Sequence, residues 1–221
     1  MSTRAIEILV QSFPKILMPG LVYTIPLTLI SFALGLALAV IVALIRVGNN
    51  KILGAICWFY VWVFRGTPQL VQLFIIFYGL PSIGIKWEAL PCAVIAFSLN
   101  VGAYASETIR GSILSVSNGQ KEACAACGLT YAQTMIHVVL PQALKASIPA
   151  LFNTFISLVK DTSLAANSTV TEMFMVTQRI VAVTYEPLLL YIEVAFIYLM
   201  FCTVLSFAQQ QIENRWKLTG K

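Results

Sequence analysis

The sequence predicts an all-α protein that crosses a membrane about five times. Of its 221 residues, 59% are hydrophobic and 10% are charged, and the mean hydropathy is +0.85. A soluble domain of this size usually carries about 25% charged residues, so this chain has too few polar side chains to cover a surface that faces water. The length corresponds to roughly one domain.

Five apolar runs are long enough to cross a bilayer, which requires roughly 20 mostly apolar residues in a helix. They are residues 20–45, 52–80, 90–113, 146–170 and 187–208. The second run is interrupted by Arg65, Gly66, Thr67 and Pro68. Because a proline lacks the backbone donor and disfavours helix in the residue before it, we expect a broken helix there. Such a break needs protein groups or cavity water to satisfy the freed backbone.

The chain divides into residues 1–19, a transmembrane domain over 20–208 and a polar tail over 209–221. The first segment is mildly amphipathic and is expected either to lie on the membrane surface or to be an irregular lead into the first span. Lys and Arg are concentrated in the loops that share a side with the C-terminus. The sequence therefore predicts an outer N-terminus and a cytoplasmic C-terminus. We attribute the net charge of +5 to this excess of basic residues on the cytoplasmic side, and not to nucleic-acid binding.

The five cysteines do not indicate a metal site. Cys124 and Cys127 form a CxxC pair, but no second pair follows, and the sole histidine, His137, is not adjacent. A structural metal site needs about four ligands, so we expect no bound metal. Buried, inert thiols are the favoured interpretation, and a membrane thiol-redox protein is a remote alternative.

The longest polar connection, residues 115–142, is expected to lie in the cytoplasm. Capping-box patterns beginning at Ser117 and at Thr130 predict two short helices. Gly128, between them, suits the left-handed residue that ends a helix. This helix–glycine–helix elbow is either a protruding docking site for a soluble partner or an ordinary loop between spans.

Polar groups inside the spans fall into three clusters. Ionisable residues in a span are costly and usually mark a cavity or pathway, although they can also pair with one another to hold helices together. Charges of both signs, with hydroxyl groups, suit a zwitterionic ligand bound near broken helices. The candidate ligand-binding residues are Arg65, Gly66, Thr67, Asn100, Tyr104, Glu107, Lys160, Asp161 and Thr162. Asn100, Tyr104 and Glu107 share one helix face. No residue is assigned a catalytic role.

The elbow carries a recognisable motif. Residues 119–129, GQKEACAACGL, and 140–144, LPQAL, resemble the cytoplasmic EAA signature of bacterial ABC importer permeases. The residues in register with that signature are Glu122, Ala123, Gly128, Leu140 and Pro141. Cys124 stands where the second alanine is usual, and it is also small.

The flanking segments narrow the resemblance. Three segments look like polar amino acid permeases of the histidine, glutamine, arginine and cystine type. They are residues 64–68, FRGTP, residues 157–164, SLVKDTSL, and Ala103 and Tyr104 with Glu107 and Arg110. Residues 77–81, FYGLP, and 160–172 look most like cystine permeases. The resemblance covers about residues 20–208.

The resemblance implies the methionine-permease-like core of a type I importer in a bacterial inner membrane. Its partners would be two ABC ATPase subunits, an extracytoplasmic solute-binding protein, and a second copy or a paralogue of the chain. The elbow residues that would couple to the ATPase are Gln120, Glu122, Ala123, Gly128 and Leu129.

The same resemblance implies a transport subunit and not an enzyme. The chain has no G-x-x-x-x-G-K-[ST] phosphate loop, so ATP and Mg²⁺ would be bound by the partner and the chain would carry no cofactor. The expected substrate is a polar amino acid. L-cystine is favoured, and histidine, arginine and glutamine are the alternatives. A passive channel or secondary carrier and a structural scaffold are the remaining alternatives.

Overall fold

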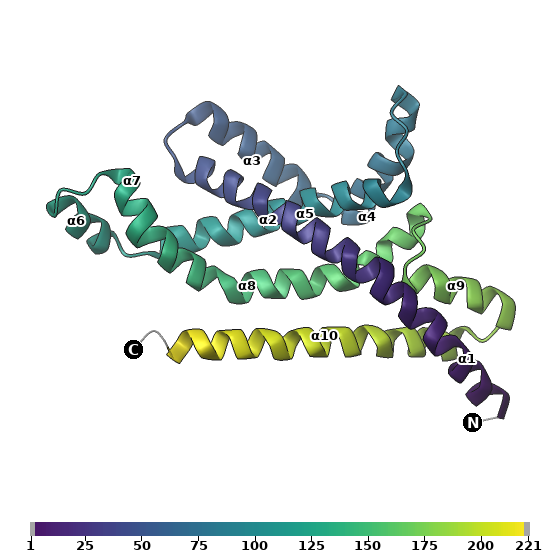
Figure 1. Cartoon of the computed structure of the whole chain (residues 1–221). Coiled ribbons are helices and arrows are strands. Elements are labelled where there is room, and N and C mark those ends of the chain that lie inside the picture. Colours follow the sequence, from purple (N-terminus) through teal and green to yellow (C-terminus); the bar gives the residue numbers. More distant parts are fainter. Residues whose placement is uncertain (1–2, 219–221) are drawn as a thin grey trace.

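A computed structural model describes residues 3–218, and within that range the chain is helical with no β-strand (Figure 1). The helices in chain order are α1 (Thr3–Pro19), η1 (Gly20–Thr24), α2 (Ile25–Val47), α3 (Lys51–Gly66), α4 (Gln69–Phe74), η2 (Ile75–Gly79), η3 (Leu80–Ile83), α5 (Ala89–Ser115), α6 (Asn118–Ala126), α7 (Tyr131–Thr134), η4 (Met135–Val139), α8 (Leu140–Asp161), η5 (Thr162–Ser168), α9 (Met173–Thr184) and α10 (Pro187–Leu218).

Four helical stretches within the described residues are long and apolar enough to cross a membrane. They are Thr3–Val47, Ala89–Ser115, Tyr131–Ser168 and Pro187–Arg215. They contain the first, third and fifth predicted spans, and the fourth except for its last two residues. The second predicted span is divided between α3 and the shorter stretch Gln69–Ile83. The helix breaks at Thr67 and Pro68, both of which have extended backbone, as the proline predicted.

The two terminal segments are continuous with the spans beside them. α1 runs into α2 through the π-helical turn η1, so residues 3–19 form a regular helix and not an irregular lead into the first span. Packing explains why the helix continues past Pro19: Ile16 is fully buried in a cluster with Met173 and Ile197. At the other end, residues 209–218 are the last turns of α10. Residues 219–221 of the predicted tail lie outside the described residues.

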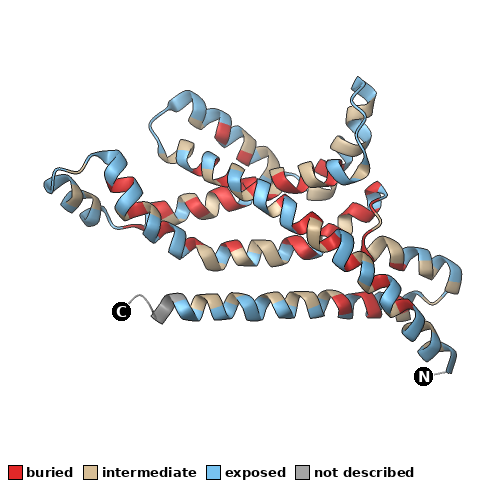
Figure 2. Ribbon diagram, viewed as in Figure 1, coloured by how far each residue is buried: buried red, intermediate tan, exposed pale blue. Residues whose placement is uncertain are grey.

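The helices α2 and α5 form the centre of the bundle, and α8 packs against α5 (Figures 1 and 2). Small buried residues on both central helices, such as Ala39 and Ala96, allow close approach. Gly35 of α2 is one of these close-packed positions. A Cβ atom added there would lie 2.7 Å from the Val101 side chain and 2.9 Å from the carbonyl oxygen of Ser98.

We predict that Gly35→Ala lowers the thermal stability of the detergent-solubilised protein, because α2 would have to move away from α5. The matched control is Gly111→Ala, since a Cβ atom at Gly111 meets nothing within 4 Å. That control should keep or raise stability, because alanine favours helix over glycine by about 1 kcal/mol. Melting curves followed by size-exclusion chromatography would measure both variants. Equal melting temperatures would refute the close packing described here.

Candidate functional site

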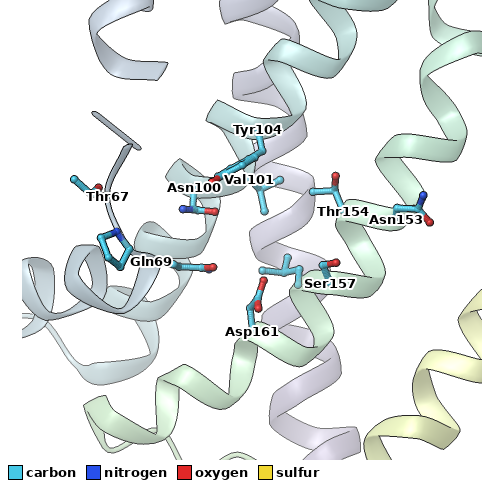
Figure 3. A pocket seen from close by; sticks show the side chains of 11 residues that line it. Thr67, Gln69, Asn100, Val101, Tyr104, Asn153, Thr154, Ser157 and Asp161 are labelled. Carbon is cyan, nitrogen blue, oxygen red and sulfur yellow. The ribbon is translucent and has the colours of Figure 1, made fainter. Parts of the chain in front are cut away.

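A polar cavity of about 450 Å³ lies among the α3–α4 break, α5 and α8 (Figure 3). Its lining residues are Thr67, Pro68, Gln69, Asn100, Val101, Tyr104, Asn153, Thr154, Ser157, Leu158 and Asp161. Most of these side chains are hydroxyls and amides, and Asp161 is the one ionisable carboxylate among them. A compact polar solute matches this lining, because each of its hydrogen-bonding groups could find a partner.

The broken helix at the cavity is held by Gln72, which is 6% exposed. Its amide donates to the carbonyl oxygens of Phe64 at 2.8 Å and Thr67 at 3.1 Å, and to the hydroxyl of Thr67 at 2.9 Å. Its own oxygen accepts from Asn100 at 3.0 Å. These bonds satisfy backbone groups that the break leaves free. They also fix Asn100, a cavity residue, to the break.

Gln69 differs from the other amides of the site, because its Nε2 atom is buried and has no hydrogen-bond partner among the described residues. The side chain points toward the cavity (Figure 3). A buried amide donor without a partner costs free energy. A solute oxygen in the cavity would remove that cost.

One face of α8 contributes Asn153, Ser157 and Asp161, which are spaced four residues apart and so follow one stripe of the helix. Thr154 joins them from the next position (Figure 3). Asn153 also accepts a hydrogen bond of 3.3 Å from Gln209 of α10. Sequence reasoning did not name Asn153, Thr154, Ser157, Gln69 or Gln72 as site residues. The four-residue spacing of polar side chains ending at Asp161 was a signal that could have found the α8 stripe.

A cluster of four charges lies next to the cavity. Glu107 of α5 pairs with Arg46 at the end of α2, with Arg110 one turn on at 2.9 Å, and with Arg65 at 3.7 Å. The Arg65 guanidinium also lies 5.4 Å above the ring of Tyr104, a cavity residue. The cluster therefore joins three helices, and Arg65 connects it to the cavity wall.

The structure brings together some of the sequence-predicted binding residues and not others. Thr67, Asn100, Tyr104 and Asp161 line the cavity, and Arg65, Gly66 and Glu107 lie beside it without lining it. Lys160 and Thr162 lie elsewhere.

Lys160 and Thr162 point away from the cavity because successive residues on a helix are about 100° apart. Lys160 lines a different, largely apolar cavity of about 640 Å³ next to α9 and α10. Thr162 is fully buried and donates to the carbonyl oxygen of Val159 at 2.7 Å. These two residues therefore do not belong to the cavity of Figure 3.

The predicted elbow is formed by α6 and α7, which protrude at one end of the molecule (Figure 1). Gly128 has φ of 78°, in the left-handed region. Its N–H donates to the carbonyl of Ala125 and the N–H of Leu129 donates to the carbonyl of Cys124, each at 3.0 Å. These two bonds define a Schellman motif. Gly128 thus ends α6 as the sequence predicted.

The two predicted capping boxes have different outcomes. At Thr130 the box is complete, since the Thr130 side chain and the Gln133 side chain each accept from the other residue's backbone. At Ser117 the helix starts as expected, but the serine side chain makes no capping bond. Gln120 instead accepts from Gln142 at 2.6 Å, which ties α6 to the start of α8.

The exposed surface of α6 includes Gln120, Glu122 and Ala123, and the helix buries no residue of its own. Leu129 is half-buried. Such an uncovered helix offers a face to another molecule. Cys124 is half-buried, Cys127 is exposed, and both are free thiols. No group of three His, Cys, Asp or Glu side chains suited to a metal occurs within residues 3–218.

Residues 35–218 match the family described as "Binding-protein-dependent transport system inner membrane component". The chain belongs to this family. It is therefore a membrane permease subunit and not itself an enzyme, and its ATPase is a separate subunit. The family also implies a solute-binding protein as a partner. The all-α type I importer fold predicted from the sequence is confirmed.

Curated relatives of this permease transport amino acids or related compounds, according to their names. The L-cystine transport system permease protein TcyB of Bacillus subtilis (strain 168) is 52% identical over 210 residues, covering 95% of this chain and 90% of TcyB. The nopaline transport system permease protein NocM of Agrobacterium fabrum (strain C58 / ATCC 33970) is 37% identical, covering 91% of this chain and 87% of NocM.

Solved structures share the fold. One is the crystal structure of an amino acid ABC transporter with histidines. A chain of that structure superposes on this permease with a TM-score of 0.90 and 31% sequence identity, and the match covers 97% of this permease and all of that chain. The MetNI methionine ABC transporter in an inward-facing form matches with a TM-score of 0.70 and 20% identity, covering 98% and 99% of the two chains.

Proposed function

We propose that this permease forms the translocation path of an ATP-driven importer of polar amino acids, and that L-cystine is its favoured substrate. The observation that carries this proposal is the cavity of Figure 3, which combines one carboxylate with several hydroxyls and amides. The 52% identity to a cystine permease supports the choice of cargo.

Each end of an amino acid has a partner near the cavity. Asp161 would accept from the substrate ammonium, because charge-assisted hydrogen bonds are the strongest polar contacts available there. The unpartnered Gln69 amide would donate to a carboxylate oxygen. Arg65, which lies over the Tyr104 ring at the cavity wall, would add a positive charge on the carboxylate side.

The assembly we propose contains two permease copies, or this chain and a paralogue, with two ATPase subunits that bind ATP and Mg²⁺. The α6 elbow, with Glu122 and Gly128, would seat on the ATPase in the cytoplasm. In Figure 1 the C-terminus lies at the same end of the molecule as α6, and the N-terminus lies at the opposite end. That arrangement supports an outer N-terminus and a cytoplasmic C-terminus.

Transport would proceed by alternating access. ATP-driven closure of the ATPase pair would push the two elbows together and open the cavity outward to receive solute from the binding protein. Hydrolysis would reverse the motion and release solute inward.

The test is ATP-dependent uptake by liposomes that contain this permease with its ATPase and binding protein. Labelled cystine would be the substrate, and histidine, arginine and glutamine the competitors. We expect cystine uptake that the other three inhibit weakly. Uptake of another amino acid instead would support the importer function and reject cystine as the substrate. The absence of uptake by an assembled complex would refute the importer function.

We predict that Asp161→Asn reduces cystine uptake roughly 10- to 100-fold, since a hydrogen bond to a charged group contributes about 1.5–3 kcal/mol. The matched control is Lys160→Gln, which changes the charge of the adjacent residue outside the cavity. Initial uptake rates over a range of cystine concentrations would compare the two. A larger loss in Lys160→Gln than in Asp161→Asn would reverse the assignment of these two residues.

A further inference from the structure

A second polar cavity, of about 410 Å³, lies between α1 and α9. Two basic side chains line it from the two helices, Lys15 from α1 and Arg179 from α9. Neither makes a hydrogen bond or an ion pair within residues 3–218. Both are exposed at the cavity. Two cations that converge on one hollow without an acid between them form a site for an anion.

The nearest acid along α1 does not neutralise this pair. Glu7 lies two turns before Lys15, and it accepts a 3.4 Å hydrogen bond from Gln11, which also lines the cavity. Glu193 of α10 is 7% exposed and accepts from Ser12 at 2.5 Å. Glu186 follows α9, two residues after Thr184, which lines the cavity. None of these three acids forms an ion pair with Lys15 or Arg179 in the described structure.

The length of the first helix places this cavity at the edge of the membrane. The stretch Thr3–Val47 has 45 residues and is therefore about 67 Å long at 1.5 Å per residue. The hydrocarbon layer is about 30 Å thick, so much of this helix extends beyond it even when tilted. Residues 20–45 carry no charge and belong in the hydrocarbon. α1 therefore reaches the headgroup layer on the side opposite the elbow.

Besides the two cations and the polar side chains of Gln11, Ser12 and Thr184, the cavity has an apolar wall. α9 contributes Val176, Ile180 and Val183, and α1 contributes Ile8. Val183 is 80% exposed, so the apolar wall continues onto the surface of the helix pair. A ligand that fits both parts has a negatively charged group joined to hydrocarbon.

We propose that this cavity binds an anionic phospholipid, with its phosphate between Lys15 and Arg179 and its acyl chains along the apolar wall. Arginine binds phosphate oxygens through paired N–H donors, and lysine adds a point charge. Basic pockets between membrane helices bind lipid headgroups in the same way. The site is separate from the cavity of Figure 3, and it does not depend on which amino acid the permease carries.

Native mass spectrometry of the purified complex of this permease with its ATPase would test the site. The complex would be equilibrated with phosphatidylglycerol or with phosphatidylcholine, and bound lipid would be counted. We expect preferential retention of phosphatidylglycerol, and about 25-fold weaker retention in the double variant Lys15→Gln/Arg179→Gln, since each basic residue contributes about a fivefold factor near an anionic lipid. The matched control is Lys51→Gln/Lys86→Gln, which removes two exposed cations elsewhere and should retain lipid like the wild type.

Four results would overturn the proposal. Equal retention of the two lipids would show that the lipid charge does not contribute to binding. An equal loss of bound lipid in both double variants would show that the effect is not specific to Lys15 and Arg179. Unchanged lipid retention in Lys15→Gln/Arg179→Gln, with weaker stimulation of ATP hydrolysis by the binding protein, would assign the two cations to protein docking. Adding inorganic phosphate separates a lipid from a free anion: phosphate in the millimolar range should not displace phosphatidylglycerol, and complete displacement would contradict the acyl-chain contacts.

Discussion

Replacing Gly128 with aspartate is expected to reduce ATP-dependent uptake by more than about 100-fold while the permease itself still folds. The left-handed backbone at Gly128, with φ of 78°, costs roughly 1–2 kcal/mol for a residue with a Cβ atom. The new carboxylate would also lie at the negative end of the α6 helix dipole. A Cβ atom there meets nothing within 4 Å inside this chain. The damage should therefore fall on docking to the ATPase.

Two variants separate the causes of that loss. Gly128→Asn keeps the size of aspartate without its charge, and asparagine tolerates the left-handed region better than most residues, so uptake should be partly retained. Gly119→Asp adds the same charge near the start of α6, where a Cβ atom is also unobstructed and where the helix dipole favours an acid. That variant should transport normally. Uptake assays and co-purification of the ATPase would measure all three, and normal uptake by Gly128→Asp would remove Gly128 from the coupling mechanism.

The features that were predictable from the sequence are those set by neighbouring residues. Pro68 alone accounts for the break between α3 and α4. Gly128 and the Thr130 capping box define the elbow within a few residues of chain. In each case the backbone chemistry of one short segment decides the outcome, so no knowledge of the fold was needed.

The features that escaped prediction depend on what packs against a helix. Pro19 and Gly20 look like a helix boundary, yet burial of Ile16 against α9 and α10 keeps α1 and α2 in one helix. Gln72 looked like an ordinary residue of an apolar run, and only the fold shows that it holds the broken backbone at Phe64 and Thr67.

Charges within the spans were the hardest to interpret, because a charged residue in a membrane signals either a ligand or a charged partner. Lys160 and Asp161 are adjacent in sequence but belong to different cavities. Glu107 shares a helix face with Asn100 and Tyr104, but it lies among three arginines instead of lining the cavity. Two of these partners, Arg46 of α2 and Arg65 of α3, are distant in sequence, and their pairing with Glu107 cannot be predicted from the sequence of α5 alone.

Replacing Glu107 with alanine should destabilise the folded permease by about 2–4 kcal/mol. Breaking a buried ion pair from one side costs about 3–5 kcal/mol, and the lower figure here reflects the partial exposure of the Glu107 side chain, 18%, and of the Arg65 side chain, 45%. The variant would leave Arg46, Arg65 and Arg110 close together without their shared anion. We expect a lower yield of monodisperse protein and a lower melting temperature in detergent.

Removing one of the opposing charges distinguishes this structural role from a direct role in substrate binding. The double variant Glu107→Ala/Arg46→Ala should recover part of the lost stability, because it relieves repulsion among the arginines. Glu88→Ala removes an exposed acid that has no capping bond at the start of the same helix, and it should leave stability unchanged. If Glu107→Ala melted like the wild type but bound cystine poorly, Glu107 would be a substrate contact and the charge cluster would not hold the helices together. If it melted lower and the double variant recovered, the cost of three unpaired guanidinium groups would explain why an acid is placed inside this membrane helix.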